Sequence, residues 1–266
     1  MRKAVLVGIN NYPDPDARLA GCVNDVLGLR ERLVTACEFR GENVRCLTDK
    51  RATKDAILLR LQWLLQGAKK GDELIFLFSG HGSQVVDRTE DEVNDHEDEI
   101  LCPYDYDDLW EDPLSDDELG AMFSHDAGEA HLTVLLDSCH SGTATRGVHR
   151  SIGKTKSVRP PIDIAMRAQQ SRAVTQRRFL DIQPGMTHLL VAGCRSDQTS
   201  SDAKIGGRPG GAFTTCLLQQ LCDGGAAQTW LQAVEGTNAL LVAEGFAQVA
   251  QLEGPAARMN GYPFVS

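Results

Sequence analysis

The sequence predicts an α/β fold in which helices flank a mostly parallel central sheet. Five short apolar segments have the length of strands, namely residues 3–9, 42–47, 73–78, 132–136 and 188–192. Most of them are continuously apolar, which is typical of parallel strands covered on both faces. Helical patterns lie between the strands, and this alternation favours right-handed crossover connections.

The intervening segments have the period of amphipathic helices. In residues 23–36 the apolar side chains of Val26, Leu29, Leu33 and Val34 share one face, and residues 54–68 repeat leucine and isoleucine at helical spacing after Thr53, a candidate N-cap. Ser115 begins a capping-box pattern that indicates a short helix before the strand at 132–136. We expect two further helices, over residues 212–221 and from about 229 to 252.

Length and composition are those of an ordinary globular protein. The chain has 266 residues, of which 42% are hydrophobic and 24% charged. Its apolar stretches are shorter than the roughly 18–20 residues that span a bilayer, and its start lacks the features of a signal peptide. The eight cysteines lack zinc-type spacing, and without a secretion signal we expect them to be free thiols. From these observations together we expect a cytoplasmic protein with no membrane partner.

Charge is distributed unevenly along the chain. The net charge of −10 argues against nucleic-acid binding. Residues 87–118 contain sixteen acids and one base, whereas residues 144–180 contain nine bases and one acid. Residues 144–186 are also polar and proline-containing, which predicts a basic flexible linker between a larger part, residues 1–143, and a smaller part, residues 187–266.

Two of the apolar runs end in reactive side chains. LIFLFSGHGSQ contains His81 between two glycines, and LTVLLDSCHSG contains Cys139 in a setting too polar for a core thiol. The ends of parallel strands meet where an open α/β sheet forms its ligand crevice. Because a thiolate is a strong nucleophile and imidazole is its usual partner, these residues predict a cysteine-nucleophile hydrolase. His140 is a weaker candidate base, since the neighbour of a nucleophile generally points elsewhere.

The two motifs SGHGSQ and DSCHSG resemble those of the metacaspases, caspase-like cysteine peptidases of plants, fungi, protists and bacteria. AVLVGIN, LAGCVNDV and VAGCRSDQTSSDA extend the resemblance over most of the chain. True caspases are less similar, because their nucleophile motif is Gln-Ala-Cys-x-Gly. The resemblance implies a caspase-like three-layer sandwich and a catalytic dyad of His81 and Cys139, with main-chain N–H groups near Gly82 and Cys139 as oxyanion donors.

The resemblance also implies a specificity pocket. Metacaspases cleave after Arg or Lys, and the residues of their pocket match Cys22, Asp25, Ser79 and Asp137. A cationic P1 side chain, the one just before the scissile bond, requires such carboxylates. Asp25 taken alone is equally explained as an acid at a helix N-terminus. We therefore expect protein or peptide substrates with a basic P1 residue and, as is usual in the family, a monomer.

Many metacaspases cleave themselves in the linker, and an acidic body with carboxylates near its nucleophile would attract a basic segment. We hypothesise self-cleavage after one or more of five basic residues, Arg146, Arg150, Lys154, Lys156 and Arg159. The alternative is a solvated loop without a regulatory role.

A calcium site is a further expectation from the resemblance. In calcium-dependent metacaspases a surface site uses aspartates that match Asp98, Asp116 and Asp117. A further family ligand lies a few residues beyond the nucleophile motif, where this chain has Thr145-Arg146 in place of an acid. Activation by Ca²⁺ is thus left open by the sequence.

Two other functions remain as alternatives. One is a catalytically weak caspase-fold module for binding or signalling, against which the intact dyad argues. The other is a different cysteine hydrolase or transferase that acts on amides or thioesters, against which the paired carboxylates argue.

Overall fold

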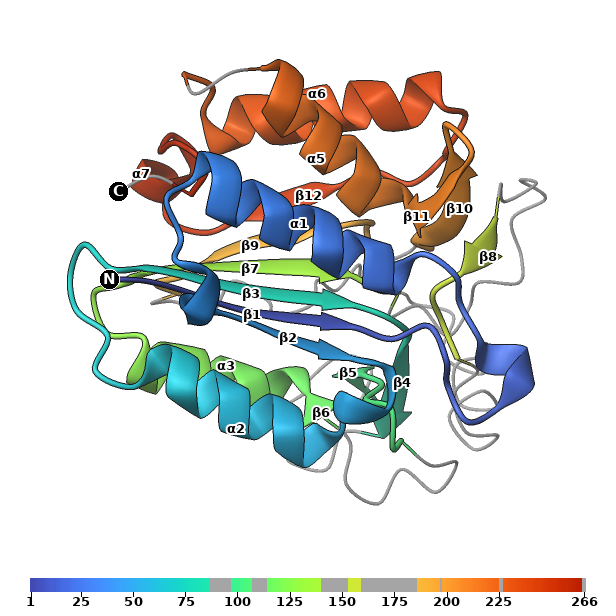
Figure 1. Ribbon diagram of the computed structural model, residues 1–266, viewed down its shortest axis with the longest axis horizontal. Helices are drawn as coiled ribbons and strands as arrows, with labels where there is room; N and C mark the ends of the chain where they lie inside the picture. Colours follow the sequence, from blue (N-terminus) through green and yellow to red (C-terminus); the bar gives the residue numbers. More distant parts are fainter. Residues whose placement is uncertain are drawn as a thin grey trace.

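A six-stranded sheet forms the middle layer of the structure, in the strand order β12-β9-β7-β3-β1-β2 (Figure 1). The computed structural model describes residues 1–86, 97–106, 114–139, 153–158, 186–196, 198–224 and 227–264. The parallel strands are β1 (Arg2–Gly8), β2 (Val44–Thr48), β3 (Glu73–Ser79), β7 (His131–Asp137) and β9 (Leu189–Ala192). The edge strand β12 (Gln251–Glu253) is antiparallel to β9.

Helices cover both faces of this sheet. On one face lie α1 (Cys22–Ala36), α5 (Ala212–Asp223) and α6 (Trp230–Ala243), and on the other lie α2 (Lys54–Leu65) and α3 (Asp116–Asp126) (Figure 1). Four short helical turns, η1 (Pro15–Ala17), η2 (Gly41–Asn43), η3 (Asp49–Arg51) and α7 (Ala256–Met259), lie between or after these elements. The predicted α/β sandwich is confirmed.

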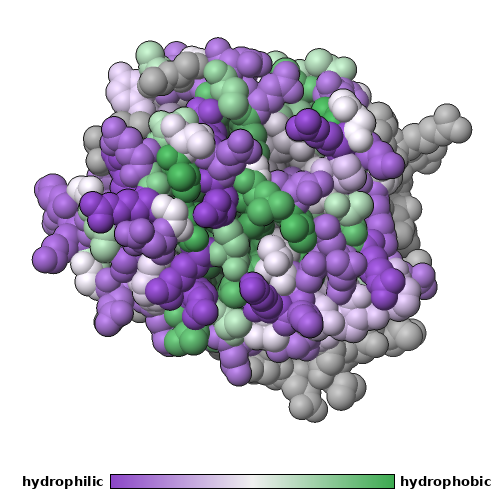
Figure 2. Space-filling model, in the orientation of Figure 1, coloured by the Kyte–Doolittle hydropathy of each residue, from purple (hydrophilic) through white to green (hydrophobic). Residues whose placement is uncertain are grey.

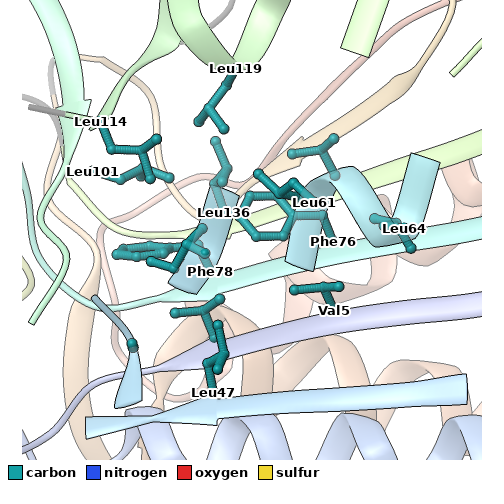
Figure 3. Packing of buried hydrophobic residues seen from close by; sticks show 14 of the residues in the cluster. Val5, Leu47, Leu61, Leu64, Phe76, Phe78, Leu101, Leu114, Leu119 and Leu136 are labelled. Atoms are coloured by element: carbon teal, nitrogen blue, oxygen red, sulfur yellow. The ribbon is translucent and has the colours of Figure 1, made fainter. Parts of the chain in front are cut away.

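Alternation along the strands divides the core into two clusters. Val5, Phe76 and Phe78 pack with Leu61 and Leu64 of α2, as Figure 3 shows. The intervening strand residues, among them Leu6, Ile75 and Leu77, pack on α1, α5 and α6. All seven residues of β3 are buried, which explains why the five between its polar ends, residues 74–78, are all apolar.

Two small antiparallel sheets stand at the carboxyl ends of the parallel strands (Figure 1). One contains β4 (Gly82–Val86), β5 (Glu97–Leu101) and β6 (Leu114–Ser115). The other contains the hairpin of β10 (Ser201–Ile205) and β11 (Arg208–Gly211), which is joined by β8 (Lys154–Thr155). These strands place additional main chain around the end of the sheet where His81 and Cys139 lie.

Most predicted elements agree with the structure, including the N-caps Thr53 and Ser115, whose side chains accept from the N–H groups of Ala56 and Glu118. The predicted helical region from 229 to 252 is wrong beyond Ala243. Gly245 there has φ of +86°, which ends the helical path, and the chain continues into β12. Within the predicted flexible linker, residues 153–158 form a defined segment that includes β8.

The exterior drawn in Figure 2 is mostly hydrophilic, with small hydrophobic patches between the polar residues. Large exposed hydrophobic residues include Leu27, Leu59 and Val242, which lie on three different helices. Among the helices of the described ranges, none is both long enough and apolar enough to span a membrane.

The packing of α2 on the sheet gives a stability prediction. Leu61 is fully buried and Leu59, on the same helix, is 57% exposed. Leu61→Ala leaves a cavity and is expected to lower the free energy of unfolding by about 3 kcal/mol. Leu59→Ala, measured in the same urea titration, is expected to change it by less than about 0.5 kcal/mol. Equal effects of the two substitutions would contradict this account of the core.

Candidate active site

His81 and Cys139 lie beyond the ends of two adjacent parallel strands. Ser79 of β3 pairs with Asp137 of β7, and each of the two reactive residues follows two positions later. The strand register alone therefore brings the imidazole and the thiol to the same edge of the sheet. Both are buried, with exposed fractions of 1% for His81 and 0% for Cys139.

The His81 ring is held in one orientation. Its Nε2 lies 2.6 Å from the carbonyl oxygen of Ala17, and its ring centroid lies 4.8 Å from that of Tyr12. A carbonyl oxygen only accepts, so Nε2 carries the hydrogen and Nδ1 keeps its lone pair. Nδ1 has no hydrogen-bond partner among the described residues. Burial lowers the pKa of His81 to about 4, so at neutral pH the ring is uncharged and Nδ1 is a free base.

The Cys139 thiol is held by the main chain of Ser200. Its Sγ accepts from the Ser200 N–H at 2.6 Å and donates to the Ser200 carbonyl oxygen at 3.2 Å. A second buried thiol, that of Cys194, donates to the carbonyl oxygen of Ser138, the residue before Cys139, at 3.7 Å. In this arrangement the Cys139 sulfur is positioned by the loop before β10 and not by the imidazole.

A lysine of the basic linker fills the space beside these two residues. Lys156 is fully buried, and its Nζ lies 3.1 Å from Asp137 Oδ2, 3.3 Å from Asp25 Oδ2 and 2.9 Å from Ser79 Oγ. Burial lowers the pKa of Lys156, but the negative charges of Asp137 and Asp25 raise it by more, so that it is well above its ordinary value. A charged ammonium is therefore stable in this closed site.

Neighbouring groups orient the two carboxylates. Asp137 accepts from Ser200 Oγ at 2.6 Å and from Thr214 Oγ1 at 2.7 Å. Asp25 accepts from Ser79 Oγ at 2.7 Å and from the Gly211 N–H at 2.9 Å. Because groups other than the lysine also hold both carboxylates, the pocket is organised for an ammonium or guanidinium group.

Burial also changes the titration of the pocket. It raises the pKa of Asp25 to about 6, although Lys156 opposes the change, and it raises the pKa of Cys22 to about 12. Cys22 is thus a neutral thiol at physiological pH. Its part in the pocket is to form a wall.

Gly211 leaves room for the lysine. A Cβ atom at this position would lie 2.0 Å from Asp137 Oδ2 and 2.4 Å from Lys156 Nζ. Any side chain there would occupy the place of the cation, so the pocket depends on glycine at the position just before α5.

The main chain of residues 153–158 crosses the site as an added strand. The carbonyl oxygen of Lys156 accepts from the N–H groups of Gly82 at 3.1 Å and Cys139 at 3.0 Å, the two donors predicted from the sequence. The Lys156 N–H donates to the Ser200 carbonyl oxygen at 3.0 Å, and β8 pairs with β10 immediately before it. The carbonyl group of Lys156 is thereby held against the residue that carries the thiol, with its oxygen between two main-chain donors.

Comparisons with known proteins agree with this geometry. A family model described as "Metacaspase, peptidase C14 domain" matches residues 2–146, slightly more than half of the chain. The chain belongs to the metacaspase family. Metacaspase-1 of Scheffersomyces stipitis is 27% identical over 94% of this chain and 70% of the relative, and Metacaspase-1B of Aspergillus terreus is 30% identical over 90% and 71%. As a metacaspase the protein is a cysteine peptidase with protein substrates.

Solved structures support the same fold. A Geobacter sulfurreducens protein is 26% identical, with a TM-score of 0.67 over 99% of this chain and 98% of that one. Caspase-1 from Spodoptera frugiperda is only 13% identical but has a TM-score of 0.63 over 100% of this chain and 90% of that one. The second likeness shows that the metacaspase has the caspase fold.

The structure brings together all the residues predicted for the dyad, the oxyanion donors and the pocket. Three further residues of the site are not predicted from the sequence. They are Ser200, Gly211 and Thr214, which hold the thiol and the carboxylates from the small part of the chain. The segment VAGCRSDQTSSDA contains Ser200, but its likeness to the family does not by itself indicate a partner for the thiol. Of the five candidate cleavage residues, Arg146, Arg150 and Arg159 lie outside the described residues, as does His140.

The predicted calcium ligands lie near the β5–β6 edge. Ile100 pairs with Ser115, so the main chain of Asp98, two residues along β5, approaches Asp116 and Asp117 at the start of α3. The side chain of Asp98 and the segment Thr145-Arg146 lie outside the described part. Within the described residues, no group of three or more metal-binding side chains is found. Calcium binding here stays a prediction.

The buried charge cluster predicts a large effect of removing its cation. In a Cys139→Ala chain, Lys156→Met leaves Asp25 and Asp137 facing each other unneutralised and is expected to lower the free energy of unfolding by roughly 3 kcal/mol. When Asp25→Asn is combined with Lys156→Met in the same chain, part of the lost free energy of unfolding is expected to return, because the two sites are coupled.

The matched control is Lys204→Met, which removes an exposed lysine from β10. It is expected to change the free energy of unfolding by less than about 0.5 kcal/mol in urea titrations. If Lys156→Met and Lys204→Met lower the free energy of unfolding equally, the buried charge cluster does not hold the linker.

Proposed function

We propose that this metacaspase cleaves peptide bonds after Lys or Arg, and that the Lys156–Ser157 bond of its own linker is a substrate. One observation carries the proposal. The ammonium of Lys156 contacts Asp25 and Asp137 while the carbonyl oxygen of the same residue accepts from Gly82 and Cys139. A bound peptide with lysine at P1 requires both contacts at once.

The chemistry follows from these positions. Cys139 attacks the carbonyl carbon of the P1 residue, and the negative charge that develops on the oxygen is stabilised by the two main-chain N–H groups. The thiol leaves its contacts with Ser200 as it attacks. The product of this step is an acyl-enzyme on Cys139 and a new amino terminus, which in the self-cleaved chain is that of Ser157.

His81 moves the protons in this proposal. Its neutral ring takes the proton of the thiol at Nδ1, the nitrogen without a partner among the described residues, and delivers it to the leaving nitrogen. The same nitrogen then activates the water that hydrolyses the acyl-enzyme. The hydrogen bond from Nε2 to Ala17 stabilises the imidazolium that forms between these steps and keeps Nδ1 directed into the site.

Self-cleavage is the most direct test. Incubation of the wild-type chain is expected to give one fragment that ends at Lys156 and another that begins at Ser157, identified by intact mass. The rate should be independent of protein concentration, since the linker is already seated within the same chain. Cys139→Ala should remain intact. Cleavage of the wild type together with an intact Cys139→Ala chain would exclude the alternative of a catalytically weak binding module.

Substitutions at Lys156 test the pocket. Lys156→Arg is expected to keep cleavage, because a guanidinium also pairs with two carboxylates. Lys156→Gln is expected to slow it by about a hundredfold or more, because the buried carboxylates are left without a cation. Lys204→Gln, the exposed control on β10, should cleave as the wild type does. Equally fast cleavage of the Lys156→Gln and wild-type chains would refute basic specificity.

The rate of self-cleavage should also depend on pH through Asp25. The pKa of its carboxyl is raised to about 6, so it becomes protonated, and neutral, as the pH falls through that value. Lys156 then loses one counter-charge, and the rate is expected to fall between pH 7 and pH 5. The pKa of His81 is about 4, so its protonation follows only at lower pH.

Asp25→Asn provides the control for this titration. The variant is expected to be slower at every pH and to lack the decrease near pH 6. The profile is measured from initial rates of fragment formation in buffers of constant ionic strength. If the rate of Asp25→Asn still decreases near pH 6, the decrease arises from the titration of another group.

A further inference from the structure

Lys154, two residues before Lys156, makes contacts of its own. Although its side chain is exposed, Nζ donates to the carbonyl oxygens of Asp16 at 2.5 Å and Arg18 at 2.6 Å. These two carbonyls flank Ala17, whose carbonyl accepts from His81. Three successive carbonyl groups of residues 16–18 therefore face the site, one toward the imidazole and two toward the lysine.

The position of Lys154 is fixed by strand pairing and not by the linker alone. Lys154 pairs with Asp202 of β10. The Asp202 carboxylate accepts from the N–H groups of Ala20 at 2.6 Å and Gly21 at 2.8 Å, which ties β10 to the segment that follows η1. Any peptide that pairs with β10 in this register has its third residue before the scissile bond, P3, beside residues 16–18.

The register is also fixed on the other side of the bond. The N–H of Val158 donates to the Gly82 carbonyl oxygen at 3.1 Å, and the Val158 carbonyl accepts from Ser83 Oγ at 3.3 Å. The segment is thus held before, at and after Lys156, so Lys154 cannot slide along β10 to a different place.

On the basis of the function proposed above, we propose that the carbonyl groups of Asp16 and Arg18 form a second specificity site, which selects Lys or Arg at P3. The two groups only accept hydrogen bonds, so they suit an ammonium or guanidinium and offer nothing to an acidic or apolar side chain. Residues 14–18 add two acids, Asp14 and Asp16, against one base, Arg18.

The expected selectivity is smaller than that at P1. The Lys156 site is fully buried, whereas the Lys154 site is open to water, which replaces a missing ligand there at little cost. Loss of the P3 cation is expected to lower kcat/KM on the order of tenfold.

Three fluorogenic peptides test the proposal on the wild-type enzyme after self-cleavage. The parent is Gly-Lys-Thr-Lys-Ser-Val, which copies the linker. The second has norleucine at P3, which keeps the length of the chain and removes the ammonium. The third has norleucine at P3 and lysine at P2, so its net charge equals that of the parent. Both altered peptides are expected to have kcat/KM about tenfold below the parent.

The outcomes separate this proposal from the one on which it rests. If all three peptides are cleaved with kcat/KM within twofold, or if the third equals the parent, the P3 site is refuted and cleavage after lysine stands. If no peptide with lysine at P1 is cleaved, the proposed function itself fails.

The same site is tested within the chain. Lys154→Gln is expected to slow self-cleavage several-fold, whereas Lys204→Gln, which removes an equal charge from the neighbouring strand, should leave it unchanged. Equal rates for the two variants would refute the proposed role of residues 16–18.

Discussion

The Lys156 ammonium lies where water does not reach, between carboxylates that come from α1 and β7. Burying three ionisable groups costs several kcal/mol for each charge unless they neutralise one another and every remaining lone pair is bonded. Ser79, Ser200, Gly211 and Thr214 meet that condition by donating to the two carboxylates. The basic linker, the first helix and the small part of the chain are held together at this point.

The sheet supplies the rigid frame for this cluster. Its parallel strands end at one edge, where the residues just beyond β3 and β7 carry the imidazole and the thiol. The short strands β4, β8 and β10 then surround that edge with main-chain donors and acceptors (Figure 1). Binding of a peptide as an added strand requires no rearrangement of the core, because the groups it meets belong to elements packed on the sheet.

Much of this could be predicted from sequence, because buried parallel strands and amphipathic helices have strong periods. His81, Cys139 and Asp137 could be placed because each follows an apolar run. The strands β10 and β12 were missed because three to five mixed residues have no period to detect. Lys156 lies in a basic stretch that is typical of a solvated loop, and only the carboxylates gathered from distant segments explain why it is buried.

We propose that the site occupied by Lys156 is the P1 pocket of a working peptidase. The most direct measurement is a crystal structure of the self-cleaved enzyme with a peptide aldehyde that has arginine at P1. We expect a bond from Cys139 Sγ to the aldehyde carbon and the guanidinium between Asp25 and Asp137. The new oxygen should lie within hydrogen-bond distance of the Gly82 and Cys139 N–H groups. An inhibitor bound elsewhere, with Lys156 still between the two carboxylates, would contradict this proposal.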